Sequence, residues 1–272
     1  MAKFLKGDIF KHIHKMTLSA SIWITSIFVV SFVDMYFLSL LWQSELIAAV
    51  WYAGILVFIL TSIGIAITIV MSSSISKLIG ADRKEYAITH AMNIYYFAFI
   101  TSIPISIFGY IYTPEMLTLI WASGSTLEYA ISYFRIILFV YPLTLIWMAS
   151  VGLLRWLGDA KKSMMPTLIA GWVNIILDPI FIFWFDWWIE GAAWATTISR
   201  LALFWIAFYW VYQHGYIKFH HINKLKTELH QITSLFFPIF LTNMTTPIGM
   251  AFVMKEFSKY GDSAVAGISV IS

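Results

Sequence analysis

The chain has 272 residues, of which 60% are hydrophobic and 11% charged, with a formal net charge of +3 and no cysteine. Apolar runs of roughly twenty residues recur along it, which excludes an ordinary soluble domain and is unlike the short alternating segments of an outer-membrane barrel. The lack of cysteine excludes disulfides and thiolate chemistry. The predicted fold class is an all-α polytopic membrane protein.

The first fifteen residues alternate apolar and basic side chains. This pattern is typical of an interfacial helix, so residues 1–15 are predicted to lie on the cytoplasmic membrane surface. They are not a cleavable signal, because the apolar run that follows is too long and contains Asp34. Membrane spans are expected over residues 17–41, 47–70, 92–111, 130–153, 165–184, 192–212 and 235–254, with another beginning at Ala264.

Lysine and arginine collect in every second loop, while the alternate loops carry acids and no basic residue until Lys255 and Lys259. Because basic residues in short loops stay in the cytoplasm, the N-terminus is predicted to be cytoplasmic, in a multi-pass protein of the cell inner (plasma) membrane. The excess of basic residues therefore reflects the orientation of the chain in the membrane, and no nucleic-acid partner is expected. The residues that set the orientation are Lys3, Lys6, Lys11, Lys15, Lys77, Arg83, Lys84, Arg155, Lys161, Lys162, Lys218, Lys224 and Lys226.

The seven histidines lie near predicted cytoplasmic span ends or in the loop from His214 to His230. No metal-ligand spacing recurs among them, so they predict no metal site. They are interpreted as solvated loop residues.

Two acids lie well inside apolar runs. Asn174 and Asp178 are four residues apart in the fifth run and share one helix face, and Asp34 lies in the first run. An ionisable group inside a span costs roughly 2.5 to 3.5 kcal/mol, which makes both acids functional candidates. At a rise of about 1.5 Å per residue, both lie roughly 10 Å inside the outer face. Two carboxylates at one depth predict a site for a shared proton or sodium ion, beside the carbonyl that Pro179 leaves without a donor.

A structural interpretation competes with this one. Arg135 and Arg200 lie at similar depth in the fourth and sixth runs, so either acid is a candidate for a permanent ion pair. Thr196 and Arg200 share a helix face by their spacing, whereas Tyr133 and Arg135 point to different sides.

An internal repeat organises the chain. Residues 42–50 (Trp-Gln-Ser-Glu-Leu-Ile-Ala-Ala-Val) and 260–268 (Tyr-Gly-Asp-Ser-Ala-Val-Ala-Gly-Ile) each follow a long apolar span preceded by a basic segment. This predicts a lobe of six transmembrane helices over 16–213, a cytoplasmic linker over 214–231 and an incomplete second lobe over 232–272. Helices without their partners leave polar groups unsatisfied in lipid, so the chain is interpreted as truncated.

Six short pieces occur together in the order and spacing of one family. They are Val33-Asp34-Met-Tyr-Phe-Leu38, Gly80-Ala-Asp-Arg83-Lys84, Tyr133-Phe-Arg135-Ile136, Leu154-Arg155-Trp-Leu-Gly158-Asp159, Asn174-Ile-Ile-Leu-Asp178-Pro179 and Gly191-Ala-Ala-Trp-Ala-Thr196. Because of these six motifs, the chain resembles the multidrug and toxic compound extrusion (MATE) transporters over nearly all of its length. The resemblance covers the N-terminal lobe and the first one to two helices of a second, pseudo-symmetric lobe. The resemblance implies two six-helix lobes and export of organic cations or drugs in exchange for H⁺ or Na⁺, so the missing C-lobe helices would be needed for a complete transporter.

One branch of that family carries a carboxylate in the seventh helix, where this chain has Thr246. The chain therefore looks more like the DinF-related branch, which implies ion coupling through Asp34, Asn174 and Asp178, with Tyr133 and Thr196 as polar partners. No cofactor beyond H⁺ or Na⁺ is implied, and the expected protein is a secondary active multidrug antiporter rather than an enzyme. Two alternatives stay open: a non-transporting fragment, and a lipid-linked-precursor flippase of the same superfamily, whose cationic cavity these acids do not match.

Overall fold

The computed structural model describes residues 9–156, 160–217 and 225–271, and these are helical apart from short turns. Among the described residues, six stretches are long and apolar enough to cross a membrane, and α1, with 31 residues, is about 46 Å long. The predicted all-α polytopic fold is confirmed. The elements are α1 (Ile9–Ser39), α2 (Ser44–Gly80), α3 (Lys84–Ile111), α4 (Thr113–Leu119), α5 (Gly124–Trp156), α6 (Ala160–Pro179), the π-helix η2 (Ile180–Trp184), α7 (Trp188–Gln213), α8 (Leu225–Ser258) and α9 (Asp262–Ile271).

Two predicted boundaries differ from the structure. The described part of the interfacial helix, from Ile9 on, is continuous with the first span in α1, because nothing in 9–17 breaks a helix; residues 1–8 lie outside the described residues. The predicted linker 214–231 is shorter, since α8 already begins at Leu225, and residues 218–224 again lie outside the description. The motif over 154–159 likewise runs into the undescribed residues 157–159.

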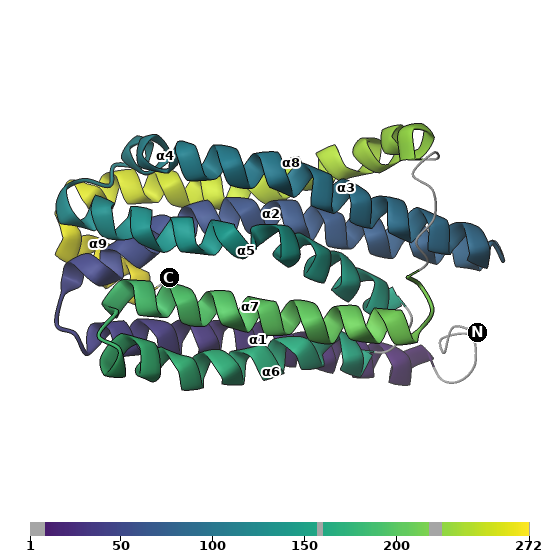
Figure 1. Ribbon diagram of the computed structural model, residues 1–272, viewed down its shortest axis with the longest axis horizontal. Helices are drawn as coiled ribbons and strands as arrows, with labels where there is room; N and C mark the ends of the chain where they lie inside the picture. The colour runs from purple at the N-terminus through teal and green to yellow at the C-terminus, as the bar shows by residue number, and fades with distance from the viewer. Residues whose placement is uncertain (1–8, 157–159, 218–224, 272) are drawn as a thin grey trace.

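Helix α5 lies at the centre of the bundle. It packs against α2 and α3 on one side and against α7 on the other, so that α2, α3, α8 and α9 form one layer and α1, α6 and α7 another (Figure 1). Gly152 lets α5 approach α2 closely, because a Cβ there would lie 2.5 Å from the Thr68 carbonyl oxygen. The Thr68 hydroxyl closes this contact by donating to the Met148 carbonyl at 2.9 Å. The two layers are therefore joined through α5.

The turns at one end of the bundle contain tryptophans in the left-handed conformation. Trp42, Trp121 and Trp188 have φ angles of 57°, 69° and 44°. They stand between α1 and α2, between α4 and α5, and at the start of α7, all at span ends that the charge pattern predicts to be outside. The α8–α9 turn contains Gly261 at φ 85°, at the place that the predicted repeat assigns to the α1–α2 turn.

Cysteine labelling will test the orientation. Single cysteines at Gln43, Ser125 and Trp187 are expected to react with a membrane-impermeant thiol reagent in intact cells, and those at Ala81 and Ala160 only after the membrane is opened. The native chain contributes no background, because it has no cysteine. The reversed pattern would invert the chain and place the two membrane acids near the cytoplasmic face.

Candidate ion and substrate site

Asn174 and Asp178 form one side of a buried polar site on α6. The two residues are 3% and 0% exposed, and the Asn174 Nδ2 donates to Asp178 Oδ1 at 3.3 Å. The i, i+4 spacing inferred from the sequence therefore produces the expected contact. The second Asp178 oxygen, Oδ2, and the Asn174 Oδ1 have no hydrogen-bond partner among the described residues.

Asp34 of α1 faces this site. Its carboxyl group lies within hydrogen-bonding range of the Asp178 carboxyl, and its buried Oδ1 also has no donor among the residues the structure describes. Asp34 precedes the end of α1 at Ser39, and Asp178 precedes the end of η2 at Trp184, so both are near the same end of the bundle. Two carboxylates cannot bond to each other without an added proton or cation, and the pair is therefore a candidate site for one.

Arg200 of α7 is the basic residue beside the pair. It lies within electrostatic range of Asp34 and of the hydroxyl of Tyr133, and Tyr133 in turn lies beside Thr196. The polar partners expected from the family resemblance are thus brought to the site. Arg135 is directed elsewhere: its Nε donates to the Tyr110 carbonyl at 3.2 Å and its guanidinium lies 4.7 Å from the Tyr110 ring centre.

Helix α6 changes its winding directly after the site. Pro179 ends the α-helix, and Ile180–Trp184 continue as a π-helix. A proline cannot donate to the preceding turn, and π turns of this kind are frequent at functional sites. Gly191 of α7 fixes this segment, since a Cβ there would lie 2.7 Å from the Phe181 backbone.

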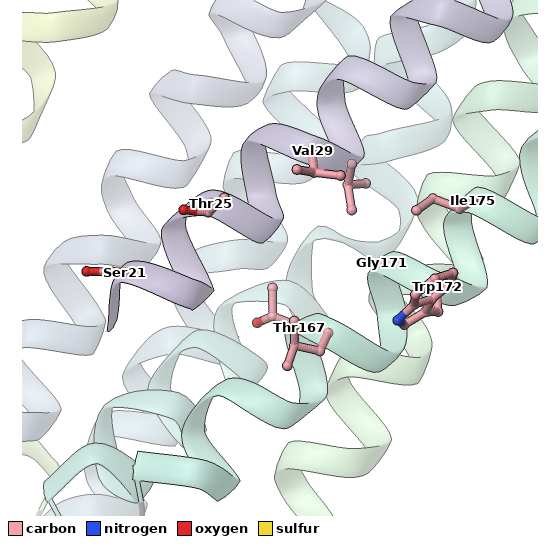
Figure 2. A pocket seen from close by; sticks show the side chains of 9 residues that line it. Ser21, Thr25, Val29, Thr167, Gly171, Trp172 and Ile175 are labelled. Atoms are coloured by element: carbon pink, nitrogen blue, oxygen red, sulfur yellow. The ribbon is translucent and has the colours of Figure 1, made fainter. Parts of the chain in front are cut away.

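An open groove of about 440 Å³ runs along the seam between α1 and α6. Figure 2 shows Ser21, Thr25 and Val29 on one wall and Thr167, Gly171, Trp172 and Ile175 on the other. The lining is apolar apart from three hydroxyl groups. Val30, also in the lining, precedes Asp34 by one helical turn, and Ile175 directly follows Asn174, but Asp34, Asn174 and Asp178 are not part of the lining.

One prediction about the histidines is wrong. His90 is 1% exposed, and its Nδ1 lies 2.8 Å from Oε2 of Glu228, which itself is 4% exposed. A buried carboxylate on α8 holds the imidazole in the protein interior, a partner 138 residues away that spacing alone does not reveal. The signal that sequence reasoning passed over was Asn93, three residues after His90 on the same helix face, which donates to the same oxygen at 2.7 Å.

The fold and site together define a polytopic α-helical membrane protein with a buried acidic pair. The MatE family model matches residues 21–180, more than half of the chain, and the chain therefore belongs to the MatE family.

Curated relatives cover nearly all of the chain. It is 25% identical over 272 residues to the multidrug export protein MepA of Staphylococcus haemolyticus (98% of this chain, 60% of the relative), and 26% identical over 269 residues to a FAD transporter of Shewanella oneidensis (96% and 59%). The chain thus spans about 60% of the length of these relatives. They are named as transporters, not as enzymes.

Solved structures agree with the fold. A crystal structure of MATE in complex with MaD3S superposes with a TM-score of 0.83 at 25% identity, covering 97% of this chain and 61% of that one. An inward-facing MATE family transporter of the MOP superfamily gives a TM-score of 0.79 at 25% identity, over 89% of this chain and 56% of that one. The six-helix lobe followed by the first helices of a second lobe is therefore confirmed as a MATE-type fold.

Proposed function

We propose that the chain is the ion-coupling part of a secondary active multidrug efflux antiporter of the DinF-like branch, which exports organic cations in exchange for H⁺ or Na⁺. The observation that carries this proposal is the set of buried oxygens without donors at Asp34, Asp178 and Asn174. A buried polar atom without a hydrogen-bond partner costs free energy inside a membrane span. A set of such atoms therefore supports a site that binds an ion.

The chemistry of the site favours a small hard cation. The atoms that would bind the ion are carboxylate, amide and hydroxyl oxygens, which suit a proton or Na⁺ and not a soft metal. Arg200 offsets part of the negative charge of the pair, so that one further positive charge brings the site close to neutrality. An incoming ion and an organic cation then compete for the same charge, which is the basis of exchange.

The α1–α6 groove suits the body of an organic cation. Its lining is mainly apolar, and the Trp172 ring and three hydroxyls offer π-face and hydrogen-bond contacts without a charge. The acids one turn beyond its end attract the positive group of the substrate. A lipid-linked pyrophosphate would instead require several basic residues there, whereas Arg200 is the basic residue that the described residues place beside the pair.

A complete transporter in the inner membrane would require facing helices beyond those of this chain. Alternating access by rocking needs two lobes that close around one site. Helices α8 and α9 pack on α2 and supply the beginning of the second lobe. We propose that the remaining C-lobe helices are the protein partner of this chain, with the lipid bilayer around both.

Vesicle transport will test the function. The protein, joined to the remaining helices, is reconstituted with a fluorescent organic cation outside and an H⁺ or Na⁺ gradient is imposed in turn. Dye accumulation driven by one gradient and abolished by its dissipation is expected. FAD serves as the anionic comparison, because one relative is named as a FAD transporter. Gradient-driven movement of FAD but not of the cations would overturn the substrate class, and movement of neither would overturn the antiporter.

A further inference from the structure

The α1–α6 groove is a surface feature that is separate from the buried ion site. The residues of the ion site are absent from its lining. Gly171 and Val30 form its floor, where the two helices are in close contact, since a Cβ on Gly171 would lie 2.8 Å from Cγ2 of Val30. The walls are open to the surroundings of the bundle, because Val29 is 50% and Trp172 66% exposed. A ligand can therefore enter the groove from the side, without passing the acids.

The groove has the length and depth of the acyl chains in one leaflet. On α1 it extends from Ser21 to Val30 and on α6 from Thr167 to Ile175, which at a rise of 1.5 Å per residue is about 12 to 14 Å. One leaflet contributes about 15 Å to a hydrocarbon core of about 30 Å. Both stretches begin near the start and end near the middle of their predicted spans. The groove therefore occupies the half of the membrane that the charge pattern predicts to be cytoplasmic.

The lining changes from polar to apolar along this length. Its hydroxyl groups, on Ser21, Thr25 and Thr167, stand at the end nearer the starts of the two helices. Trp172 and Ile175 stand toward the membrane centre (Figure 2). A phospholipid of that leaflet has the same order, because its ester-linked glycerol lies at the edge of the hydrocarbon and its chain ends lie at the centre. The polarity of the groove thus matches a lipid in its ordinary bilayer orientation.

Basic residues precede the polar end of the groove on both helices. Lys11 and Lys15 belong to the first two turns of α1 and Lys162 to the first turn of α6, and residues 9–20 and 160–166 contain no acid. Lys15 precedes Ser21 by six residues and Lys162 precedes Thr167 by five, which is about 8 to 9 Å along the helices. The headgroup region adds about 5 to 8 Å on each side of the hydrocarbon. These lysines therefore belong at the level of the lipid phosphates.

We propose that the α1–α6 groove binds an anionic phospholipid of the surrounding bilayer. One acyl chain lies against Trp172 and Ile175, the glycerol region lies at the hydroxyl groups, and the phosphate faces the basic first turns of α1 and α6. Length, order of polarity and sign of charge each match this ligand. A helix of the remaining C-lobe spans both leaflets and would not match a change of polarity within one. The inference goes beyond the proposed function and does not rest on it, although a cationic substrate in the groove would compete with the lipid.

Photo-labelling of the full chain in nanodiscs tests the site. The probes are phosphatidylglycerol and phosphatidylcholine with the same diazirine at the end of one acyl chain, at equal mole fraction, and the adducts are located by peptide mass spectrometry. A lysine near the headgroups favours an anionic lipid by about fivefold, so phosphatidylglycerol should label Trp172 at least about fivefold more than phosphatidylcholine. Trp205 of α7, also 66% exposed but outside the groove, measures general lipid contact. It should be labelled equally by both probes, because the last turn of α7 has no basic residue.

Matched variants locate the preference in the groove. Thr25→Trp should fill the groove and remove the preference, whereas Leu18→Trp on the same helix, 54% exposed and outside the lining, should leave it unchanged. Lys162→Gln should lower the preference by up to about fivefold, and Lys84→Gln at the exposed start of α3 should not change it. Asp34→Asn should leave the labelling intact, so that a failure of transport and a failure of the lipid site are separate results.

Two results would overturn the lipid site. Equal labelling of Trp172 by the two probes, or a preference that survives Thr25→Trp, would show only contact with bulk lipid. Absence of label at Trp172 beside normal label at Trp205 would show that protein covers the groove. If Thr25→Trp does not fold, an equal preference in Lys162→Gln and Lys84→Gln still overturns the binding of the headgroup.

Discussion

Replacing Asp34 or Asp178 by asparagine is expected to abolish ion-driven efflux while leaving the protein folded in the membrane. Asparagine preserves the shape of the side chain and removes the charge that binds the ion. One charge at about 4 Å and an effective dielectric of about 20 contributes about 4 kcal/mol, so the affinity for the ion should fall roughly a thousandfold. The measurement is gradient-driven accumulation of a cationic dye in vesicles that contain equal amounts of completed protein.

Glu115→Gln is the matched control for these variants, because it removes an exposed acid at the same end of the bundle and should leave efflux unchanged. Asn174→Ala is expected to give a smaller loss, since it removes a neutral ligand and the donor to Asp178. Full dye export against a gradient by both aspartate variants would show that the acids are structural.

Arg200→Gln is expected to destabilise the protein by roughly 1 to 3 kcal/mol, because it removes a buried positive charge that lies within electrostatic range of the buried Asp34. The double variant Arg200→Gln/Asp34→Asn should be less destabilised than the sum of the single changes, by about 1 to 3 kcal/mol. The corresponding coupling with Asp178 should be smaller, since Arg200 interacts with Asp34, Tyr133 and Tyr141 in the structure. Unfolding in detergent, followed for all four proteins of each cycle, measures these couplings.

Arg135→Gln is the matched control for this cycle. The residue lies at a similar depth but contacts only the Tyr110 carbonyl and ring among its described partners, so its loss should cost about 1 kcal/mol or less. Equal costs for the two arginines, or no coupling between Arg200 and Asp34, would contradict the assignment of Arg200 as the counter-charge of the pair.

The sequence predicted those parts of the structure that depend on local composition. Span positions follow from hydropathy, which each segment carries by itself, and the contact between Asn174 and Asp178 follows from their spacing on one helix. The common depth of Asp34 and Asp178 also follows from their positions in the two spans. These features need no knowledge of how the helices are rotated.

The features that were missed depend on helix rotation and on distant partners. Depth alone did not distinguish Arg135 from Arg200, since the choice depends on which face of each helix points inward. The burial of His90 depends on Glu228, which lies in a segment that the sequence pattern assigned to a polar linker. The π-helix after Pro179 was also not expected, because proline predicts a lost hydrogen bond but not how the chain rewinds.

The left-handed tryptophans at one end of the bundle tie the fold to the thickness of its lipid environment. A side chain in this conformation costs roughly 1 to 2 kcal/mol, and Trp42 is 93% exposed, so contacts within the protein do not repay the cost there. Indole rings gain free energy at the level of the lipid headgroups. A bilayer whose headgroups coincide with these rings holds the turns closed, whereas a thinner or thicker one withdraws that support. The stability of these turns is therefore expected to depend on the lipid composition of the host membrane.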